Sequence, residues 1–369
     1  MKHAIPTLLH VYPSFDLGGA QRRFVQLANH FGGEYRHLII SLKGGSGAFA
    51  LLGAGVEARM LDIGPSPGGT WNCVRKYRRI LDRLRPDLLV TSNWGSIEWA
   101  IANLDGHVPH LHMEDGFGPE EASRQLPRRV WTRRLVLRRS TVMLPSETLY
   151  RLAREVWRLP ARRLVFVPNG IDCARFTPSP DPAFAGALGL AGDRPVIGTV
   201  AVLRPEKNLI RLLDAFALVL RQHDAQLVIV GDGPERARLE AQARALAIGE
   251  RVLFTGSCAS PERLLPSFDV FALSSDTEQM PISLLEAMAA GRAAAATDVG
   301  DVCRILAGEN LPFVVPPDAG RLGDALLQLL SDPAARRKIG AANAARARDC
   351  FDQQAMFAAY RKLYAGGRA

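Results

Sequence analysis

Short apolar runs recur along the whole chain, and the segments between them carry apolar residues at helical spacing. The runs lie at 8–11, 38–42, 88–91, 111–113, 142–144 and 164–167 in the first half, and at 195–200, 227–230, 252–254, 270–273, 294–297 and 313–315 in the second. Runs of this length suit buried strands, and their alternation with amphipathic segments is typical of parallel sheets covered by helices. The pattern therefore predicts an α/β protein.

Two such series of strands and helices imply two doubly wound domains. A length of 369 residues accommodates two domains of ordinary size. The turn sequence Pro-Asn-Gly-Ile-Asp at 168–172 and the Pro-rich stretch at 177–182 separate the two series, as expected of a domain linker. We predict a first domain over 1–175 and a second domain over 183–350.

The segment 274–291 combines a polar loop with an apolar helix, and it follows the predicted strand at 270–273. Pro281 suits the first helical position because its missing N–H costs nothing there, and Gly291 suits the C-terminal cap. Open α/β sheets bind ligands at the carboxyl ends of their strands, and the free N–H groups in the first turn of a helix favour a phosphate. The segment is therefore a candidate ligand site.

Two glutamates lie in this segment. Glu278 is in the loop, and Glu286 falls on the edge of an apolar stripe formed by Ile282, Leu285 and Ala289. A buried ionised carboxylate needs hydrogen-bond donors that apolar surroundings do not supply, and ligand hydroxyls would supply them. The alternative is that both glutamates are solvated and that the helix merely packs.

A pair of cations follows the predicted strand at 195–200. Arg204 and Lys207 lie where this strand would lead into a helix. Cations near a helix N-terminus are mildly unfavourable, so binding of an anion explains them better than a solvated helix start does. Positioned cations of this kind stabilise negative charge on a bound anion without a metal ion.

The first half of the chain contributes glycines and histidines. Gly18 and Gly19 lie between the first strand and the first helix, where glycine either lets the backbone approach a ligand or makes an ordinary turn. His110 and His112 share one face of a strand because side chains alternate along it. A metal site is one alternative, although spacing places no third ligand, and a structural role for His112 is another.

Together these elements resemble the retaining, metal-independent family 4 glycosyltransferases. The matching elements are Glu278 and Glu286 as an E-x7-E element, Arg204 and Lys207 as an Arg-x-x-Lys pair, and Gly-Gly-Ala-Gln-Arg at 18–22. The resemblance implies the GT-B fold, in which two Rossmann-like domains have a cleft between them. It also implies that a C-terminal helix within 351–369 crosses back to the first domain.

The resemblance also assigns roles to residues. It implies catalytic roles in contacting the donor sugar and its diphosphate for His112, Arg204, Lys207 and Glu278. It implies donor binding by Gly18, Gly19, Cys258, Gln279, Met280, Pro281, Ile282 and Glu286, the last holding the ribose. The implied reaction moves a sugar from a UDP- or GDP-sugar to a hydroxyl acceptor, a lipid-linked or polysaccharide precursor, with retention at the anomeric carbon. No cofactor and no metal ion are expected.

Four residues depart from the family pattern. Gln21 replaces an acid, Gln279 and Asp301 replace glycines, and Ala293 replaces a proline. None of these changes removes a proposed catalytic group. Two other functions stay open: a sugar-nucleotide epimerase on a similar two-domain fold, and a non-catalytic scaffold that binds a nucleotide sugar or a membrane.

The net charge is +9, and most of the cations are arginines. Between 124 and 163 the arginines are interleaved with Trp131 and Trp157, and only Glu147 and Glu155 oppose them within that segment. This pattern is typical of a surface that lies against an anionic membrane, and no nucleic-acid-binding motif accompanies it. We expect an anionic membrane or glycolipid as the partner rather than nucleic acid, with an ordinary solvated face as the alternative.

Five cysteines are scattered without metal-like spacing, which suits a reducing compartment. No apolar run is long enough to span a membrane, and the interrupted apolar stretch after Lys2 predicts a first strand rather than a signal peptide. The sequence therefore predicts a cytoplasmic protein, either free or peripheral on the inner face of the membrane.

Overall fold

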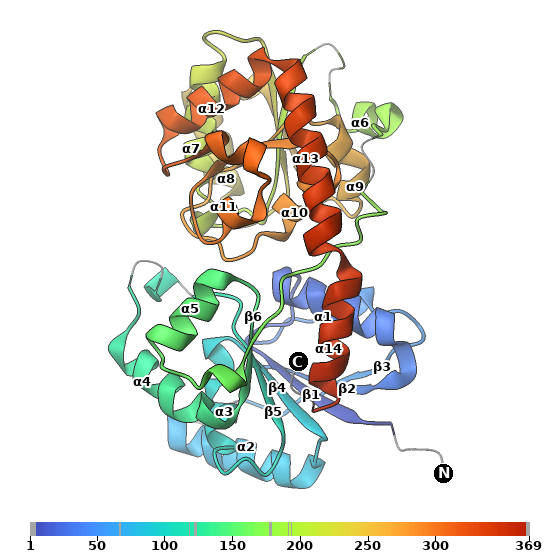
Figure 1. Cartoon of the computed structure of the whole chain (residues 1–369), viewed down its shortest axis with the longest axis vertical. Coiled ribbons are helices and arrows are strands. Elements are labelled where there is room, and N and C mark those ends of the chain that lie inside the picture. The colour runs from blue at the N-terminus through green and yellow to red at the C-terminus, as the bar shows by residue number, and fades with distance from the viewer. Residues whose placement is uncertain are drawn as a thin grey trace. The chain divides into compact units, whose positions relative to one another are not determined.

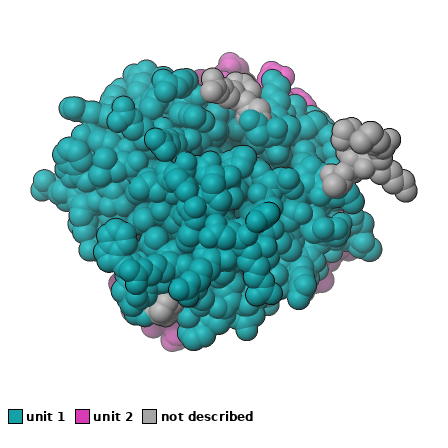
Figure 2. All heavy atoms as spheres, turned by 90° about the horizontal axis from the view of Figure 1, so that it is seen from below, with its two compact units in different colours: residues 1–169, 354–369 teal, residues 170–353 magenta. Residues whose placement is uncertain are grey.

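The chain forms two compact units, which are coloured separately in Figure 2. The computed structural model describes residues 5–65, 68–117, 119–121, 124–176, 179–190, 192 and 194–366. Unit 1 comprises residues 1–169 and 354–369, and unit 2 comprises residues 170–353. The division after residue 169 precedes the linker expected at 177–182, of which Thr177 and Pro178 lie outside the described residues.

Unit 1 is built on a parallel sheet with the strand order β3-β2-β1-β4-β5-β6-β7 (Figure 1). In chain order its strands are β1 (Thr7–Tyr12), β2 (Arg36–Ser41), β3 (Glu57–Met60), β4 (Leu88–Ser92), β5 (His110–Met113), β6 (Thr141–Leu144) and β7 (Leu164–Phe166). Its helices are α1 (Gly19–Phe31), α2 (Thr70–Leu84), α3 (Ile97–Ala102), α4 (Pro127–Val136), α5 (Glu147–Glu155) and α14 (Gln353–Tyr364). The chain order reverses between β1 and β4, which makes this the point where doubly wound sheets bind ligands.

Unit 2 has a parallel sheet of the same kind, ordered β10-β9-β8-β11-β12-β13, with its reversal between β8 and β11. Its strands are β8 (Val196–Val200), β9 (Gln226–Val230), β10 (Val252–Gly256), β11 (Val270–Leu273), β12 (Ala293–Thr297) and β13 (Val314–Val315). Its helices are α6 (Pro182–Ala187), α7 (Leu209–Val219), α8 (Arg236–Ala245), α9 (Pro261–Leu264), α10 (Ile282–Ala289), α11 (Val302–Ile305), α12 (Ala319–Ser331) and α13 (Pro333–Phe351). Across the described part of both units, no helix combines the length and apolar character that crossing a membrane requires.

The predicted α/β architecture is confirmed, and each predicted apolar run forms a strand whose ends differ by no more than one or two residues. Strand β3 was not predicted. It lies at the edge of its sheet, where Glu57 and Arg59 are exposed and alternate with half-buried residues, so it has no continuous apolar run. Helix α10 begins one residue later than predicted, because Pro281 is its N-cap residue rather than its first helical residue.

Strand β12 of unit 2 consists almost entirely of small residues. Ala293, Ala294, Ala295 and Ala296 are fully buried, and α10, α12 and α13 all contact this strand. Alanine side chains let helices approach a sheet closely, so α10 and its Glu286 are held firmly against β12. A Cβ on Gly340 of α13 would lie 2.0 Å from the carbonyl oxygen of Gly291, so glycine is required at this contact.

Helix α14 follows unit 2 in the chain but packs within unit 1, as the resemblance implied (Figure 1). Its residues Met356, Tyr360 and Leu363 are buried in one hydrophobic cluster with residues of β1 and α1. The ring of Phe357 stacks on the ring of His30, with centroids 3.8 Å apart. The last helix therefore completes the core of the first unit.

His10 and His37 form a buried pair in this core. Nε2 of His10 lies 3.0 Å from Nδ1 of His37, and neither residue is exposed. Burial lowers the pKa of His37 to about 4, and burial together with the neighbouring His37 holds the pKa of His10 well below its ordinary value. Both imidazoles are therefore neutral in the folded protein at neutral pH.

Unit 1 is expected to lose stability as the pH falls from 6.5 towards about 4. In this window the unfolded chain binds protons on these histidines and the folded unit does not, so acid favours the unfolded state. For His37 alone the loss in the free energy of unfolding reaches about 3 kcal/mol at the acid end. Urea unfolding followed by tryptophan fluorescence measures this, because all 5 tryptophans belong to unit 1.

Replacing His37 provides the control for this pH dependence. His37→Gln removes one titrating group, so the variant should show a flatter dependence of unfolding free energy on pH than the wild type. His223→Gln, in unit 2, should leave the dependence seen by tryptophan fluorescence unchanged. Equal pH slopes in the wild type and His37→Gln would contradict the buried neutral pair.

Candidate functional site

The predicted catalytic residues of unit 2 follow the two strands at its reversal point. Strands β8 and β11 are neighbours in the sheet although they are distant in sequence. The segment after β8 contains Arg204 and Lys207, and the loop after β11 contains Glu278. Because parallel strands end at the same edge of a sheet, the two segments meet where ligands bind in this class of fold.

Lys207 and Glu278 form an ion pair at this edge. The Nζ atom of Lys207 lies 2.5 Å from Oε1 of Glu278, which also accepts a hydrogen bond from the Ser275 hydroxyl at 2.8 Å. The Glu278 side chain is 9% exposed and the Lys207 side chain 24% exposed. An ammonium group and a carboxylate thus lie side by side. The ammonium group can donate hydrogen bonds to phosphate oxygens, and the carboxylate can accept hydrogen bonds from sugar hydroxyls.

A short polar network fixes the geometry of this pair. Residues Pro205–Lys207 form a 3-10 turn that ends at Asn208, the N-cap residue of α7. Asn208 donates to both carboxylate oxygens of Asp276 at 3.1 Å, and Arg211 donates to Oδ1 of Asp276 at 2.6 Å. The loop after β11 is therefore tied to the start of α7, which holds Lys207 and Glu278 in register.

Gly300, in the loop after β12, supports Glu278 from the other side. Its φ is +57°, and a Cβ at this position would lie 1.8 Å from the carbonyl oxygen of Glu278. The N–H of Asp301 donates to the carbonyl oxygen of Gln279 at 3.3 Å. Gly300 was not among the predicted site residues, and its position in a strand-to-helix turn was the only signal that could have indicated it.

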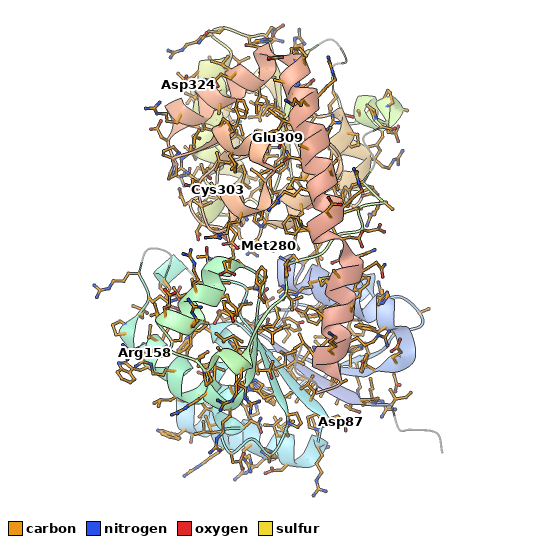
Figure 3. The ribbon with its side chains drawn as sticks, viewed as in Figure 1. Asp87, Arg158, Met280, Cys303, Glu309 and Asp324 are labelled. Carbon is orange, nitrogen blue, oxygen red and sulfur yellow. The ribbon has the colours of Figure 1, made fainter. Side chains whose placement is uncertain are left out.

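The residues between Glu278 and Glu286 are more buried than their predicted role in donor binding suggested. Met280, labelled in Figure 3, is 8% exposed and packs in the hydrophobic core of unit 2. Pro281 is also buried, whereas Gln279 and Ile282 are half-buried. The Met280 side chain therefore serves packing in the core of unit 2.

The other predicted residues of unit 2 differ in exposure. Glu286 lies on α10 and is 8% exposed, so the expectation that it occupies a buried edge of the helix is confirmed. Arg204 is exposed, as a group that meets an incoming anion must be. Cys258 is half-buried in the loop after β10 and packs against the hydrophobic core.

In unit 1, Gly18 and Gly19 lie at the end of β1, on one side of the reversal point. Gly18 is the N-cap residue of α1, and Gly19 is its first residue. A Cβ on Gly18 would lie 2.8 Å from Oε1 of Gln21, whose amide donates to the carbonyl oxygen of Ser14 at 2.8 Å. Gln21, which replaces the acid of the family pattern, therefore closes this turn.

His110 and His112 share one face of β5, as strand alternation predicted. The Thr91 hydroxyl of β4 lies 2.7 Å from Nε2 of His110 and 2.8 Å from Nδ1 of His112. Nδ1 of His110 lies 2.7 Å from the Ser140 hydroxyl, and His112 has no exposed surface. Among the residues that the structure describes, no group of three or more His, Cys, Asp or Glu side chains could hold a metal ion.

Glu114, which was not predicted as a site residue, connects His112 to a buried arginine. Its Oε2 atom lies 3.5 Å from Nε2 of His112 and accepts a hydrogen bond from Nε of Arg133 at 3.2 Å. Arg133 also donates to both carboxylate oxygens of Glu121, at 3.2 and 3.1 Å. The side chain of Arg133 is 1% exposed, and those of His112 and Glu114 are 0% exposed.

Aromatic rings enclose the Arg133 guanidinium. Its central carbon lies 5.0 Å from the ring centroid of Trp94, 5.3 Å from that of Phe117 and 4.9 Å from that of Trp157. Trp157 is itself fully buried, and its Nε1 donates to Gln125 at 2.6 Å. Cation–π contacts therefore add to the ion pairs that hold Arg133.

These contacts correct the interpretation of residues 124–163 as one basic face. Arg129 and Arg133 are buried, and they pair with glutamates from the preceding loop, so Glu147 and Glu155 are not the only acids that oppose the arginines. Trp157 lies in the core and is not available to a membrane. Trp131, by contrast, is 57% exposed on α4.

Two family models match the two halves of the chain. The model described as Glycosyltransferase Family 4 matches residues 17–175, and the model described as Glycosyl transferases group 1 matches residues 182–346.

Curated relatives match part of the chain. A GDP-mannose-dependent monoacylated alpha-(1-6)-phosphatidylinositol monomannoside mannosyltransferase from Corynebacterium glutamicum is 31% identical over 260 residues, covering 66% of this chain and 64% of that protein. An N-acetyl-alpha-D-glucosaminyl L-malate synthase from Bacillus anthracis is 28% identical over 177 residues, covering 48% and 46%. The chain spans about half the length of the first curated relatives that it matches.

Solved structures match nearly the whole chain. The structure of Anabaena Alr3699/HepE in complex with UDP and glucose has a TM-score of 0.83 and 19% identity, covering 97% of this chain and 99% of that one. At this identity the likeness concerns the fold, and it confirms the GT-B architecture. The two family models together match most of the chain, and they show that it belongs to the family 4 glycosyltransferases, the glycosyl transferases of group 1.

Proposed function

We propose that the protein transfers a sugar from a nucleoside diphosphate sugar to a hydroxyl acceptor, with retention at the anomeric carbon and without a metal ion. The observation that carries this proposal is the Lys207–Glu278 pair at the reversal point of unit 2. The pair places a cation that can bind a phosphate next to a carboxylate that can bind sugar hydroxyls, at the carboxyl edge of the sheet. Membership of the glycosyltransferase family supports the same reaction class.

In this proposal different residues of unit 2 bind different parts of the donor. Lys207 and Arg204 bind the diphosphate and stabilise the negative charge that grows on it as the glycosidic bond breaks. The ammonium group of Lys207 has three donors, so it keeps its bond to Glu278 while it binds a phosphate oxygen. Glu278 accepts hydrogen bonds from the donor sugar, and Glu286 accepts them from the ribose.

The proposed donor is a UDP- or GDP-sugar, and the proposed acceptor is a lipid-linked or polysaccharide precursor. The relative from Corynebacterium glutamicum is named for GDP-mannose and for a phosphatidylinositol mannoside, and the Anabaena structure contains UDP and glucose. His112 of unit 1 is the remaining residue that the family resemblance assigns to the donor sugar.

Calorimetric thermal unfolding with UDP, GDP and their sugars, in EDTA, tests this function. A ligand at 100 times its Kd stabilises the unit that binds it by about 2.7 kcal/mol, so the unfolding transition of unit 2 should shift upwards with a nucleoside diphosphate. Incubation of the binding sugar nucleotide with candidate acceptors should then yield a glycoside with the anomeric configuration of the donor. Activity that requires an added divalent ion would contradict the metal-free proposal.

The same assay separates the two rival functions. An epimerase would change the sugar of the nucleotide without any acceptor. A scaffold would bind the nucleotide sugar and leave it intact under every condition. Either result would replace the transferase proposal.

We also propose that α4 and the residues that follow it bind an anionic membrane or glycolipid. Trp131 and Leu135 are 57% and 64% exposed on α4, one helical turn apart, and Arg128, Arg138 and Arg139 beside them in sequence are exposed. Large exposed apolar side chains among arginines are typical of a helix that lies in a membrane interface. Arg129, Arg133 and Trp157 are buried and do not belong to this surface. The exposed residues still combine arginines with large apolar side chains, as predicted.

Co-sedimentation with vesicles of varied anionic lipid content should detect this binding. Each arginine near an anionic surface contributes on the order of 1 kcal/mol, so binding should fall steeply with salt. Changing Arg128, Arg138 and Arg139 to glutamine should abolish it. Changing the exposed Arg221, Arg238 and Arg244 of unit 2 to glutamine removes the same charge and should have little effect. Indifference of the wild type to acidic lipid at low salt would rule out a membrane partner.

A further inference from the structure

A groove lies within unit 1, between helix α2 and the edge strand β3. Its volume is about 1090 Å³, and its lining consists of residues 59–63 and of α2 residues between Asn72 and Leu84. Helix α2 packs against α3, whereas β3 is the last strand of its sheet. The sheet therefore ends beside α2 and leaves the groove open along about 18 Å of the helix.

Five cations and a single carboxylate line this groove. The cations are Arg59, Arg75, Lys76, Arg79 and Arg83, and the carboxylate is that of Asp62. Lys76 already has partners, because its Nζ atom donates to the carbonyl oxygens of Gly64 and Pro65 at 3.1 and 2.8 Å. The four arginines are exposed, and none of them has an ion pair or a side-chain hydrogen bond with the residues that the structure describes.

Three of these arginines form a row along α2. Arg75, Arg79 and Arg83 are four residues apart, so they share one face of the helix, with about 6 Å between successive positions along its axis. Like charges at this spacing destabilise a helix, and a bound anion would remove that cost. Arg78 of the same helix is paired instead, with Asp82 at 3.2 Å and Asp105 at 2.7 Å.

The groove also has an aliphatic floor. Leu61, Ile63, Ile80 and Leu84 line it, are half-buried, and pack against the hydrophobic cluster beneath α2. These residues occupy the same length of the groove as the arginines, whereas a single phospholipid would need its charges at one end and its apolar contacts at the other. A bilayer surface does not enter a concave groove. An extended chain with acidic groups at regular intervals fits both the charges and the shape.

We propose that this groove binds an extended acidic polysaccharide, with its acidic groups on the arginine row and the C–H faces of its sugar rings on the aliphatic floor. Arginine and a carboxylate or phosphate form strong charge-assisted hydrogen bonds. Trp71, which is 76% exposed, directly precedes the first lining residue of α2 and offers a ring for stacking of a further sugar. The proposal deepens the proposed function and rests on it in one respect, namely that the polyanion is a carbohydrate that serves as acceptor.

Calorimetric titration with hexagalacturonate, a carbohydrate with one carboxylate on each residue, tests this site. The wild type should bind it, and the affinity should fall as salt is raised. The groove variant, in which Arg75, Arg79 and Arg83 are changed to glutamine, should bind about tenfold more weakly, because each exposed ion pair contributes about a factor of two. Equal affinities in the wild type and the groove variant would overturn the proposal.

Two controls separate the groove from the overall charge of the protein. The unit 2 variant, with Arg221, Arg238 and Arg244 changed to glutamine, loses the same charge and should bind hexagalacturonate like the wild type. Maltohexaose, which is uncharged, should bind much more weakly than hexagalacturonate. The groove variant should unfold in urea at no lower concentration than the wild type, since the change removes only exposed and mutually repelling charges. Equal loss of affinity in the unit 2 variant would mean that no specific site exists.

Other polyanions provide the competing outcomes. Tighter binding of a single-stranded oligonucleotide than of hexagalacturonate, lost in the groove variant, would assign the groove to nucleic acid and overturn the proposal. The groove variant should still co-sediment with acidic vesicles, because its α4 is unchanged, and loss of that binding would assign the groove to lipid. If hexagalacturonate binds in the groove but no sugar nucleotide binds to unit 2, the proposed function fails and the polysaccharide site stands. If a sugar nucleotide binds and hexagalacturonate does not, the polysaccharide site alone fails.

Discussion

Lys207→Ala and Arg204→Ala are each expected to lower the rate of sugar transfer by about 10²–10³-fold while unit 2 stays folded. Each change removes a cation from the place where the leaving diphosphate develops charge, and one such contact is typically worth about 3 kcal/mol in the transition state. Arg204 is exposed and the Lys207 side chain is 24% exposed, so neither change leaves a cavity in the core. Rates of product formation at saturating donor measure the effect.

The Lys207 variant has a second expected consequence. Glu278 is 9% exposed and loses the cation that lies 2.5 Å away, and the Ser275 hydroxyl still donates to its Oε1 atom. Lys207→Ala should therefore impair donor binding as well as turnover, whereas Arg204→Ala should act mainly on turnover. Arg221→Ala, an exposed change in the same unit, provides the control and should be close to wild type. Near wild-type activity in both site variants would refute the assignment of these cations to the leaving group.

Arg133→Met is expected to destabilise unit 1 by about 3–5 kcal/mol, the typical cost of removing one partner from a buried ion pair. Methionine fills much of the space between Trp94, Phe117 and Trp157. The loss of stability is therefore caused by the missing charge rather than by a cavity. The Glu114 carboxylate is left buried without the guanidinium that pairs with it, and Glu121 keeps its hydrogen bond from Arg129. Urea unfolding monitored by tryptophan fluorescence measures the change.

A matched surface variant and a change of pH test the explanation. Arg138→Met removes the same charge from an exposed position and should change the stability by no more than about 0.5 kcal/mol. Lowering the pH protonates carboxylates, so the deficit of Arg133→Met relative to the wild type should shrink in acid. A loss below about 1 kcal/mol at neutral pH would mean that the buried network contributes little.

The strands could be predicted from the sequence because burial on both faces of a parallel sheet imposes continuous apolar runs. Strand β3 could not, because its place at the sheet edge leaves Glu57 and Arg59 exposed and breaks the run. The two-unit plan could be predicted from the two series of strands and the Pro-rich stretch between them, and the returning terminal helix from the family resemblance. The Lys207–Glu278 contact follows from the strand order, since it depends on β8 and β11 being neighbours.

The polar network of unit 1 could not be predicted, because charges carry no period that indicates burial. Arg133 resembles its exposed neighbours in sequence, and only its contacts with Glu114 and Glu121 distinguish it. Trp157 was expected in a membrane interface for the same reason, although its ring packs on Arg133. Thr91 lies in an apolar run and gave no sign that its hydroxyl joins two histidines.

The return of α14 to unit 1 has a consequence for the order in which the chain folds during synthesis. Unit 2 is continuous in sequence from residue 170 to residue 353, so all of it is synthesised before the last helix. Unit 1 emerges first but lacks Met356, Tyr360 and Leu363 of its hydrophobic cluster until α14 has left the ribosome. The earlier-made half of the molecule is therefore the later one to complete its core, and until then its apolar surface is open to chaperones.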